Sequence, residues 1–199
     1  GDWLTELLRQ CAHPGGAAIC GAMLWYPDET IQHAGIVTGL GGYAGHSHKY
    51  KKKGGSGYLF RTSTVQDFSG VTGACLLVKT AVYDEMHGLD EQLAVAFNDV
   101  DFCLRVRDAG YRIAWTPYAE LIHYESKSRG GDEKDPVKAA RFAAEQQRLY
   151  TIHGKENILD DPYYNPNLTR DREDFSESDD LRRLKEGMVT VRFLGGTLQ

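Results

Sequence analysis

Apolar residues recur at helical spacing at the start of the chain and then give way to a continuous apolar run. The first group follows Asp2, a residue suited to capping a helix, and consists of Trp3, Leu4, Leu7, Leu8 and Cys11. Pro14-Gly15-Gly16 ends that predicted helix. Residues 17–26 are apolar at nearly every position, which predicts a strand buried on both faces. After a turn at Pro27-Asp28, residues 30–38 predict a returning strand.

Residues 39–58 are rich in glycine and predict a long loop. His46 and His48 are spaced like a metal-binding pair, but no carboxylate or cysteine lies near them in sequence. We therefore expect them to be mobile surface histidines. The run Lys51-Lys52-Lys53 is suited to a phosphate, although a solvated charge cluster is the more common explanation for such a run.

The second half of the chain alternates between strand and helix patterns. An apolar strand is predicted over 71–79 with Gly73-Ala74 inside it, then a short helix capped by Thr80 and ended by Gly88, and a loop over 89–97. Residues 99–109 predict a helix stopped by Gly110. Further elements are a strand over 111–116 ended by Pro117, an extended piece over 119–124, and a helix from Pro136 to about Ile152 capped by Asp135.

Composition after residue 155 changes to polar sequence without apolar periodicity. The chain is therefore divided into a folded portion, residues 1–155, and an extended polar C-terminal arm, residues 156–199. Hydrophobic residues make up 41% and charged residues 26%, as in ordinary globular proteins. The longest apolar run is too short to span a membrane. The formal net charge of −5 argues against a nucleic-acid partner.

The four cysteines, Cys11, Cys20, Cys75 and Cys103, form no closely spaced pair. The sequence therefore does not indicate a zinc-finger or a thioredoxin-type site. Each cysteine has apolar neighbours, so we expect small buried side chains in a reducing compartment.

Candidate chemistry begins with two carboxylates, Asp99 and Asp101, at the start of the predicted helix. Carboxylates there can cap the helix, ligate a metal or act as a general base. One cap explains one aspartate, and Arg105 is placed to pair with Asp101 at a spacing of four residues. Asp99 remains the better candidate for a base, because it follows a loop and can project into a cleft.

A second group of polar residues follows the strand that comes next. His123 can ligate a metal through a neutral imidazole, and Ser126, Ser128 and Arg129 are suitable donors to phosphate oxygens. Taken singly, His123 is more often a structural histidine. Its position just before these donors favours a functional role.

Several motifs in order resemble the second half of family-2 glycosyltransferases with the GT-A (nucleotide-diphospho-sugar transferase) fold. They are residues 71–78 (VTGACLLV), 88–91 (GLDE), 97–105 (FNDVDFCLR), 109–112 (AGYR), 116–121 (TPYAEL) and 123–130 (HYESKSRG). Residues 26–35 and 161–168 also fit the bacterial rhamnosyltransferase and polysaccharide-assembly subgroup, and the resemblance covers most of residues 2–175. It implies an α/β fold with a mixed sheet flanked by helices.

The resemblance also implies roles for individual residues. Asp99 would be the general base of an inverting sugar transfer from a nucleotide-sugar to an acceptor hydroxyl, with Asp101 and Asn98 shaping the acceptor site. Gly73, Ala74, Ser126, Ser128 and Arg129 would lie on the donor side. His123 would contact a divalent cation, Mn²⁺ or Mg²⁺, or the diphosphate. Asn98 stands where the family usually has the first acidic residue of a pair.

The resemblance leaves the nucleotide-binding half unaccounted for. In the family that half precedes these motifs and ends in an Asp-x-Asp after an apolar strand, which this sequence lacks. We therefore expect a fragment whose partner is the N-terminal half of the same enzyme, with weak or absent metal and donor binding of its own. A non-catalytic carbohydrate-binding or assembly module is the alternative. The acceptor would be a glycan or a lipid-linked molecule. The location would be cytoplasmic, with peripheral contact with a membrane as an option, and self-association of the chain is a third alternative.

Overall fold

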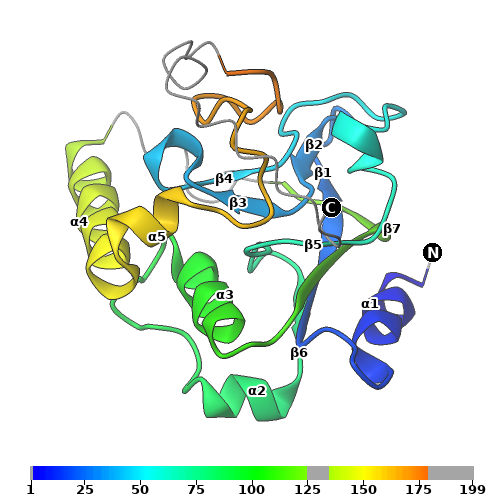
Figure 1. Ribbon diagram of the computed structural model, residues 1–199, viewed down its shortest axis with the longest axis horizontal. Coiled ribbons are helices and arrows are strands. Elements are labelled where there is room, and N and C mark those ends of the chain that lie inside the picture. The colour runs from blue at the N-terminus through cyan, green and yellow to red at the C-terminus, as the bar shows by residue number, and fades with distance from the viewer. Residues whose placement is uncertain (1, 125–134, 179–199) are drawn as a thin grey trace, which may run out of the picture.

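The computed structural model describes residues 2–124 and 135–178, which form a mixed α/β structure around a curled sheet (Figure 1). Strand β1 is central: it runs parallel to β7 on one side, and it pairs antiparallel with both β2 and β6 on the other. The outer edge of β7 pairs antiparallel with β5. The bounds are β1 Ile19–Trp25, β2 Ile31–His33, β5 Gln66–Asp67, β6 Leu76–Val78 and β7 Ile113–Ile122.

Every residue of β1 is buried, as its unbroken apolar run predicts. Side chains on successive residues of a strand point to opposite faces, so β1 contributes to two cores. Cys20, Ala22 and Leu24 pack with Leu7 and Cys11 of helix α1, Trp3–Ala12. Ile19, Met23 and Trp25 belong to the larger core on the other face, which contains Trp115, Phe68 and Phe102.

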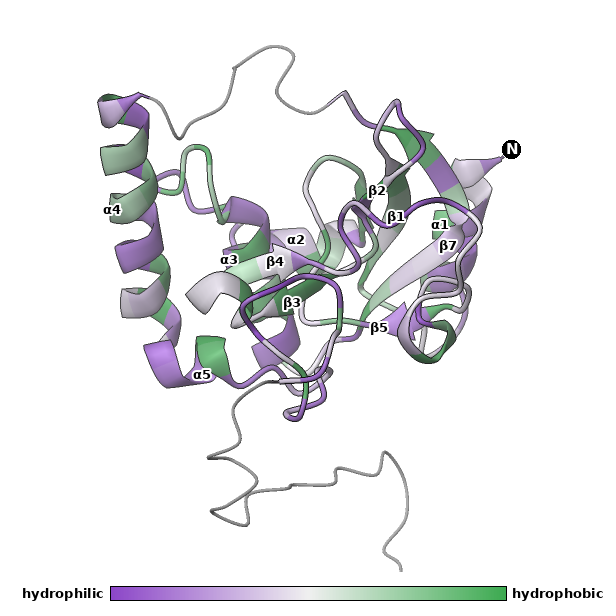
Figure 2. Cartoon of the chain, turned by 90° about the horizontal axis from the view of Figure 1, so that it is seen from above, coloured by the Kyte–Doolittle hydropathy of each residue, from purple (hydrophilic) through white to green (hydrophobic). Residues whose placement is uncertain are grey.

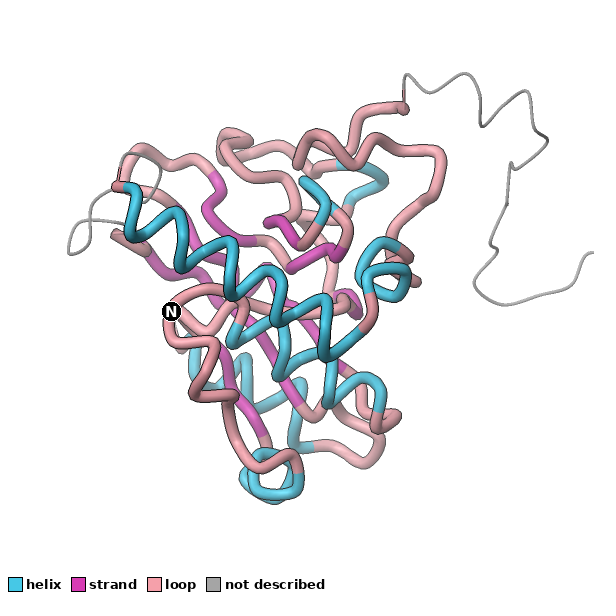
Figure 3. The backbone as a smooth tube through the Cα atoms, turned by 90° about the vertical axis from the view of Figure 1, so that its left-hand side faces the viewer, coloured by secondary structure: helices cyan, strands magenta, loops and turns pink. Residues whose placement is uncertain are grey.

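Helix α3, Asn98–Asp108, lies between the sheet and helix α4, Pro136–His153. Phe102 and Val106 of α3 pack in the sheet core, whereas Val100 and Leu104 pack with Leu149 of α4. Figure 3 shows α4 in front with the strands behind it, and Figure 2 shows purple and green residues mixed along α4. Asp135 caps α4 by accepting from the backbone N–H groups of Val137 and Lys138, as predicted.

The remaining elements are short. Helix α2 spans Thr80–Glu85 with Lys79 rather than the predicted Thr80 as its N-cap, and α5 spans Lys155–Leu159. A separate two-stranded sheet pairs β3, Ile36–Thr38, with β4, Ala44–His46. The 3-10 turns are η1, Leu40–Gly42, and η2, Tyr58–Phe60.

The prediction of a single strand over 30–38 and a plain loop over 39–58 is wrong in detail. Gly35, with φ +97°, divides the predicted strand into β2 and β3, and the glycine-rich segment supplies β4 and both 3-10 turns. His48 is not a mobile surface residue: it is 1% exposed and stacks on Phe175 at 4.2 Å between ring centroids. Spaced glycines hid these elements, because they suppress the apolar periodicity on which prediction rests.

Strand β7 continues through Pro117, where the sequence predicted a stop. The pairing with β1 passes from Ala22–Thr116 to Met23–Glu120, so residues 117–119 form a three-residue bulge. A proline is compatible with a strand at such a bulge because no ladder hydrogen bond is required of it there. The predicted strand over 71–79 shortens to β6, because residues 72–75 form a turn that includes Gly73.

The described part of the C-terminal region, residues 156–178, packs against the body of the protein. Tyr164, Leu168 and Phe175 are buried in the sheet core. The buried Asp161 carboxylate accepts from the backbone N–H of Thr38 at 2.7 Å. Burial raises the pKa of Asp161, against the opposing effect of this hydrogen bond. Sparse aromatic residues in polar sequence therefore bring this segment onto β3.

The cysteine prediction is confirmed for burial. Cys11, Cys20 and Cys103 are buried, Cys75 is partly buried, and all four are free thiols. Burial raises the pKa of each, that of Cys103 to about 12, which keeps the thiols protonated and unreactive near neutral pH.

Gly35 and Gly54 provide a matched test of packing around the sheet core. Both have positive φ, +97° and +93°, but a Cβ at Gly35 would lie 2.6 Å from the Phe68 ring, whereas one at Gly54 meets nothing within 4 Å. Gly35→Ala is expected to lower the free energy of unfolding by about 1–3 kcal/mol more than Gly54→Ala, because only the first overpacks the core. Urea unfolding of both variants measures the difference, and equal losses would contradict the packing argument.

Candidate active site at the start of helix α3

The first turn of α3 is held from outside by a buried carboxylate of α4. Phe97, just before α3, has φ +64°, an uncommon conformation for a residue with a side chain. Glu145 of α4 is buried, and its two carboxylate oxygens accept from the backbone N–H groups of Val95 at 3.2 Å and Ala96 at 2.8 Å. The loop that enters α3 is therefore fixed by α4 rather than by its own sequence.

Asp99 lies in the first turn of α3 and points toward the turn that contains Gly73. Its Oδ2 accepts from the backbone N–H of Gly73 at 2.8 Å, and its Oδ1 accepts from the N–H of Val100 at 2.9 Å. The side chain is half-buried. An ionised carboxylate has about four acceptor positions, so each oxygen keeps a lone pair for a further donor.

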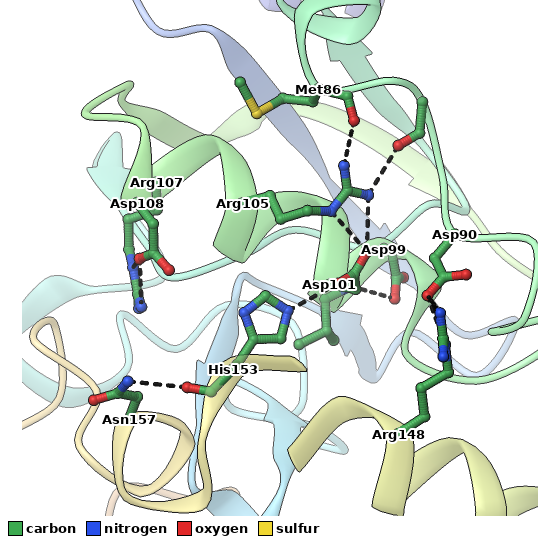
Figure 4. A network of polar contacts seen from close by, with 12 residues as sticks. Met86, Asp90, Asp99, Asp101, Arg105, Arg107, Asp108, Arg148, His153 and Asn157 are labelled. Atoms are coloured by element: carbon green, nitrogen blue, oxygen red, sulfur yellow. Dashed lines mark hydrogen bonds and ion pairs between the residues drawn. The ribbon is translucent and has the colours of Figure 1, made fainter. Parts of the chain in front are cut away.

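Asp101 points the other way and is fully buried, with a side-chain exposure of 0% (Figure 4). Its Oδ2 accepts from Nε and Nη2 of Arg105 at 3.0 and 2.8 Å, and its Oδ1 lies 2.8 Å from Nε2 of His153, the last residue of α4. Arg105 also donates to the carbonyl oxygens of Met86 and Gly88 after α2. The predicted pairing of Asp101 with Arg105 is confirmed.

Burial alone would raise the pKa of Asp101. The hydrogen bonds from His153 and Arg105, together with the charge of Arg105, outweigh burial and leave the pKa below its usual value. Asp101 is therefore ionised near neutral pH, and both of its oxygens are occupied by partners. A surface hollow of about 340 Å³ borders this cluster and is lined by residues that include His87, Asp90, Arg105 and Arg148.

Three histidines gather near the Gly73 turn, which the sequence did not indicate. Nδ1 of the buried His33 lies 2.9 Å from Nδ1 of His46, and Nε2 of His33 lies 3.4 Å from the backbone N of Thr72. Burial lowers the pKa of His33 well below its usual value, and the rings of His46 and His123 lower it further. His123 therefore lies close enough to His33 to affect its pKa, and His33 contacts Thr72, the residue before Gly73.

His123 follows the carboxyl end of β7, and its backbone N–H donates to the carbonyl oxygen of Trp25 at the end of β1. Its ring Nδ1 is buried without a hydrogen-bond partner in the described part of the protein. A buried polar atom without a partner is uncommon and leaves this nitrogen available to a ligand. Carboxyl ends of parallel strands are the usual place for ligand sites in α/β proteins.

The structure thus brings together part of the predicted set. Asp99 and Gly73 are in direct contact, Ala74 follows in the same turn, and Asn98 opens α3 beside Asp99. Ser126, Ser128 and Arg129 lie outside the described residues. Among residues 2–124 and 135–178, no group of three histidine, cysteine or acidic side chains is arranged to hold a metal ion.

Sequence reasoning missed Glu145, His153 and His33. Glu145 and His153 occur in a helix whose polar positions look solvent-facing, and only the packing of α4 on α3 turns them inward. His33 lies in a short strand with no neighbouring polar motif. The one signal in the sequence was Glu145, a charged residue in the middle of the helix face that packs on α3.

Comparisons with known proteins connect the chain to polysaccharide biosynthesis. No protein-family model matches it. An uncharacterized protein of Sinorhizobium fredii is 48% identical over 175 residues, which cover 87% of this chain and 19% of that protein. An O-antigen biosynthesis protein of Myxococcus xanthus is 34% identical over 98% of this chain and 15% of its own length.

An N-acetylglucosaminyl-diphospho-decaprenol L-rhamnosyltransferase of Mycobacterium tuberculosis is 32% identical over 80 residues, which are 40% of this chain and 24% of the enzyme. The chain is therefore distantly homologous to a rhamnosyltransferase and an O-antigen biosynthesis protein, and is related to glycosyltransferases of polysaccharide biosynthesis. It spans less than a quarter of the length of these relatives. None of the helices in the described ranges is both long and apolar enough to cross a bilayer.

Asp101→Asn is expected to lower the free energy of unfolding by about 3–5 kcal/mol at pH 7, because it leaves Arg105 facing a neutral group in a buried site. The lowered pKa means that the stabilisation by Asp101 is present above the unfolded-state pKa near 4 and is lost as the pH falls through the folded-state value. Wild type should therefore lose more stability below about pH 4 than Asp101→Asn.

Urea unfolding at several pH values measures both effects. Asp108→Asn is the control, since this aspartate of α3 is 60% exposed and, within the described ranges, its one ion-pair partner is the neighbouring Arg107. It should change the free energy of unfolding by less than about 0.5 kcal/mol. An Asp101→Asn protein as stable as the control would show that the buried network does not stabilise the fold.

Proposed function

We propose that this chain is the acceptor-side portion of an inverting family-2 glycosyltransferase with a GT-A fold, acting in polysaccharide or glycoconjugate synthesis. The observation that carries the proposal is Asp99. Its carboxylate is held by the Gly73 N–H in the first turn of α3, which is itself fixed by α4. The distant homology to a rhamnosyltransferase supports a sugar nucleotide as donor and rhamnosyl transfer as a specific candidate.

In the proposed reaction, Asp99 accepts the proton of an acceptor hydroxyl as that oxygen forms a bond to the anomeric carbon of the donor sugar. The bond from this carbon to the diphosphate oxygen breaks, and the nucleoside diphosphate leaves with the electron pair. Attack opposite the leaving group inverts the anomeric configuration. Asn98 would lie beside the acceptor. Asp101, which points away from Asp99, would shape the acceptor side indirectly, by fixing α3 through Arg105 and His153.

Gly73, Ala74, Ser126, Ser128 and Arg129 are assigned to the donor side of this proposal. His123 would supply one ligand to a divalent cation, Mn²⁺ or Mg²⁺, and its unpartnered buried Nδ1 is suited to that role. The described residues offer no complete set of metal ligands. The remaining ligands and most nucleotide contacts would therefore come from a further half of the same enzyme, which is the partner we propose.

The proposed location is the cytoplasmic side of a membrane, with peripheral contact. A lipid-linked or glycan acceptor fits the name of the mycobacterial relative, which gives that enzyme an acceptor with a decaprenol chain. An enzyme acting on such a lipid can stay at the surface of the bilayer without spanning it.

Asp99→Asn in the full-length protein is expected to lower sugar transfer at least about 100-fold, because an amide cannot accept the acceptor proton. The fold should persist, since the amide oxygen can still accept from the Gly73 N–H and only the contact with the neighbouring N–H of Val100 is lost. Release of nucleoside diphosphate from uridine- and thymidine-diphospho-sugars measures transfer, and thermal unfolding measures the fold.

Asp84→Asn on the exposed side of α2 is the matched control and should leave transfer unchanged. An Asp99→Asn enzyme that keeps more than about a tenth of the control turnover would reject Asp99 as the base, since general-base catalysis contributes far more than this.

A non-catalytic carbohydrate-binding or assembly module is the second candidate, favoured by the lack of a complete metal-ligand set in the described ranges. Calorimetry separates the two. The chain alone is expected to bind uridine or thymidine diphosphate with Mn²⁺ only weakly, and the full-length protein is expected to bind one of them in the micromolar range. Tight nucleotide binding by the chain alone would contradict the assignment of the donor contacts to a further half. Absence of nucleotide binding by the full-length protein would favour the non-catalytic module.

A further inference from the structure

The segment between β4 and β5 differs from the rest of the molecule in carrying both a cluster of basic residues and exposed apolar side chains. Between residues 30 and 66 the sequence has four lysines and one arginine and no aspartate or glutamate, in a chain with a net charge of −5. Lys51, Lys52 and Lys53 are exposed, and Lys49 is partly exposed. In Figure 1 this segment, coloured cyan to teal, lies at the outer end of β1 and β2.

The same segment exposes two large apolar side chains at the η2 turn. Leu59 is 75% exposed and Phe60 is 66% exposed. Both have positive φ, 46° and 62°, which residues with a Cβ adopt rarely. Nearby, the hydroxyl of the exposed Tyr118 donates to the carbonyl oxygen of Ser63 at 3.2 Å. We call residues 59–60 the apolar tip and residues 49–53 the basic segment.

The base of the apolar tip is attached to the protein core. The N–H of Tyr58 donates to Nε2 of the buried His48 at 3.0 Å, and the Thr62 hydroxyl donates to the Gly55 carbonyl at 2.8 Å. The Tyr58 ring also packs against Phe175. Burial lowers the pKa of His48 to about 4, so near neutral pH this ring is uncharged and can accept the Tyr58 N–H.

The basic segment and the apolar tip are close to one another. Lys51 of the basic segment and Arg61, the residue after the tip, both lower the pKa of His48, so both lie near its ring. The Lys51 side chain also runs along Gly55, whose carbonyl accepts from Thr62. Lys53 is tied to Glu120 at 2.7 Å, whereas no ion pair joins Lys51 or Lys52 to a carboxylate of the described residues.

We propose that the apolar tip and the basic segment form a membrane-contact surface that binds an anionic lipid bilayer. Leu59 and Phe60 would enter the boundary between headgroups and acyl chains, where an exposed apolar pair gains most. Lys51 and Lys52 would lie against lipid phosphates, with Tyr118 at headgroup depth. The inference makes the proposed peripheral location specific, yet it does not depend on sugar transfer.

Vesicle sedimentation of the full chain tests the surface. We expect binding to vesicles of equimolar phosphatidylcholine and phosphatidylglycerol, little binding to phosphatidylcholine alone, and weaker binding at high salt. Leu59→Ser/Phe60→Ser should lower the partition coefficient at least about tenfold. Leu89→Ser/Val137→Ser, which removes exposed apolar side chains elsewhere, should have little effect.

Charge reversal provides the second pair of variants. Each lysine near an anionic surface contributes about fivefold to binding, so Lys51→Glu/Lys52→Glu should lower it more than about tenfold. Lys79→Glu/Lys155→Glu makes the same charge change before α2 and in α5 and should lower it much less. Wild type that fails to bind the mixed vesicles, or control pairs that lose as much as the test pairs, would overturn the proposal.

Insertion of the tip has a direct readout. Phe60→Trp should be quenched by brominated lipids in mixed vesicles, and Val137→Trp should not. Vesicle binding without quenching at position 60 would overturn the role of the tip.

Light scattering tests whether a second copy of the chain, rather than a bilayer, covers the tip. A dimer that Leu59→Ser/Phe60→Ser converts to monomer, with no vesicle binding, would assign the tip to that second copy. If the full-length protein binds vesicles but transfers no sugar, the proposed function is rejected while the membrane-contact surface stands.

Discussion

One buried carboxylate holds the helical side of this protein in place. Asp101 is fully buried, and its two oxygens bind groups from two directions, Arg105 within α3 and His153 at the end of α4. Arg105 extends the connection to the backbone after α2. A buried charge must be compensated by well-placed partners, so this carboxylate imposes the relative positions of three helices rather than simply adding a contact.

The division of labour between the two aspartates follows from that constraint. Because Asp101 is occupied on both oxygens, it is poorly suited to exchange a proton with a substrate, while Asp99 keeps free lone pairs toward the Gly73 turn. The fixed helix lets Asp99 be placed without burying it. Glu145 completes the support by holding the backbone that enters α3. A functional site needs rigid support, and here α4 gives that support to α3 through Glu145 and His153.

Sequence patterns predicted what depends on neighbours along the chain. The buried run of β1, the span of α3, the Asp135 cap and the Asp101–Arg105 pair all rest on spacing within one element. Features set by distant packing were missed. The inward side chains of α4, the histidine group at His33 and the burial of His48 depend on which face meets another segment, and a single sequence carries little of that information. Polar sequence also concealed the aromatic contacts of residues 156–178.

The bulge in β7 has a consequence for how chain length can vary. Three residues, Pro117 to Ala119, stand between two neighbouring pairs with β1, and three is an odd number. Side chains alternate along a strand, so an odd excess reverses which face the following residues occupy. Glu120 thereby comes to the face of Trp25, whose indole N–H it accepts, while Thr116 faces Glu6 of α1. Insertions or deletions at this point preserve the arrangement only in steps of two, so parity rather than length is the constrained property.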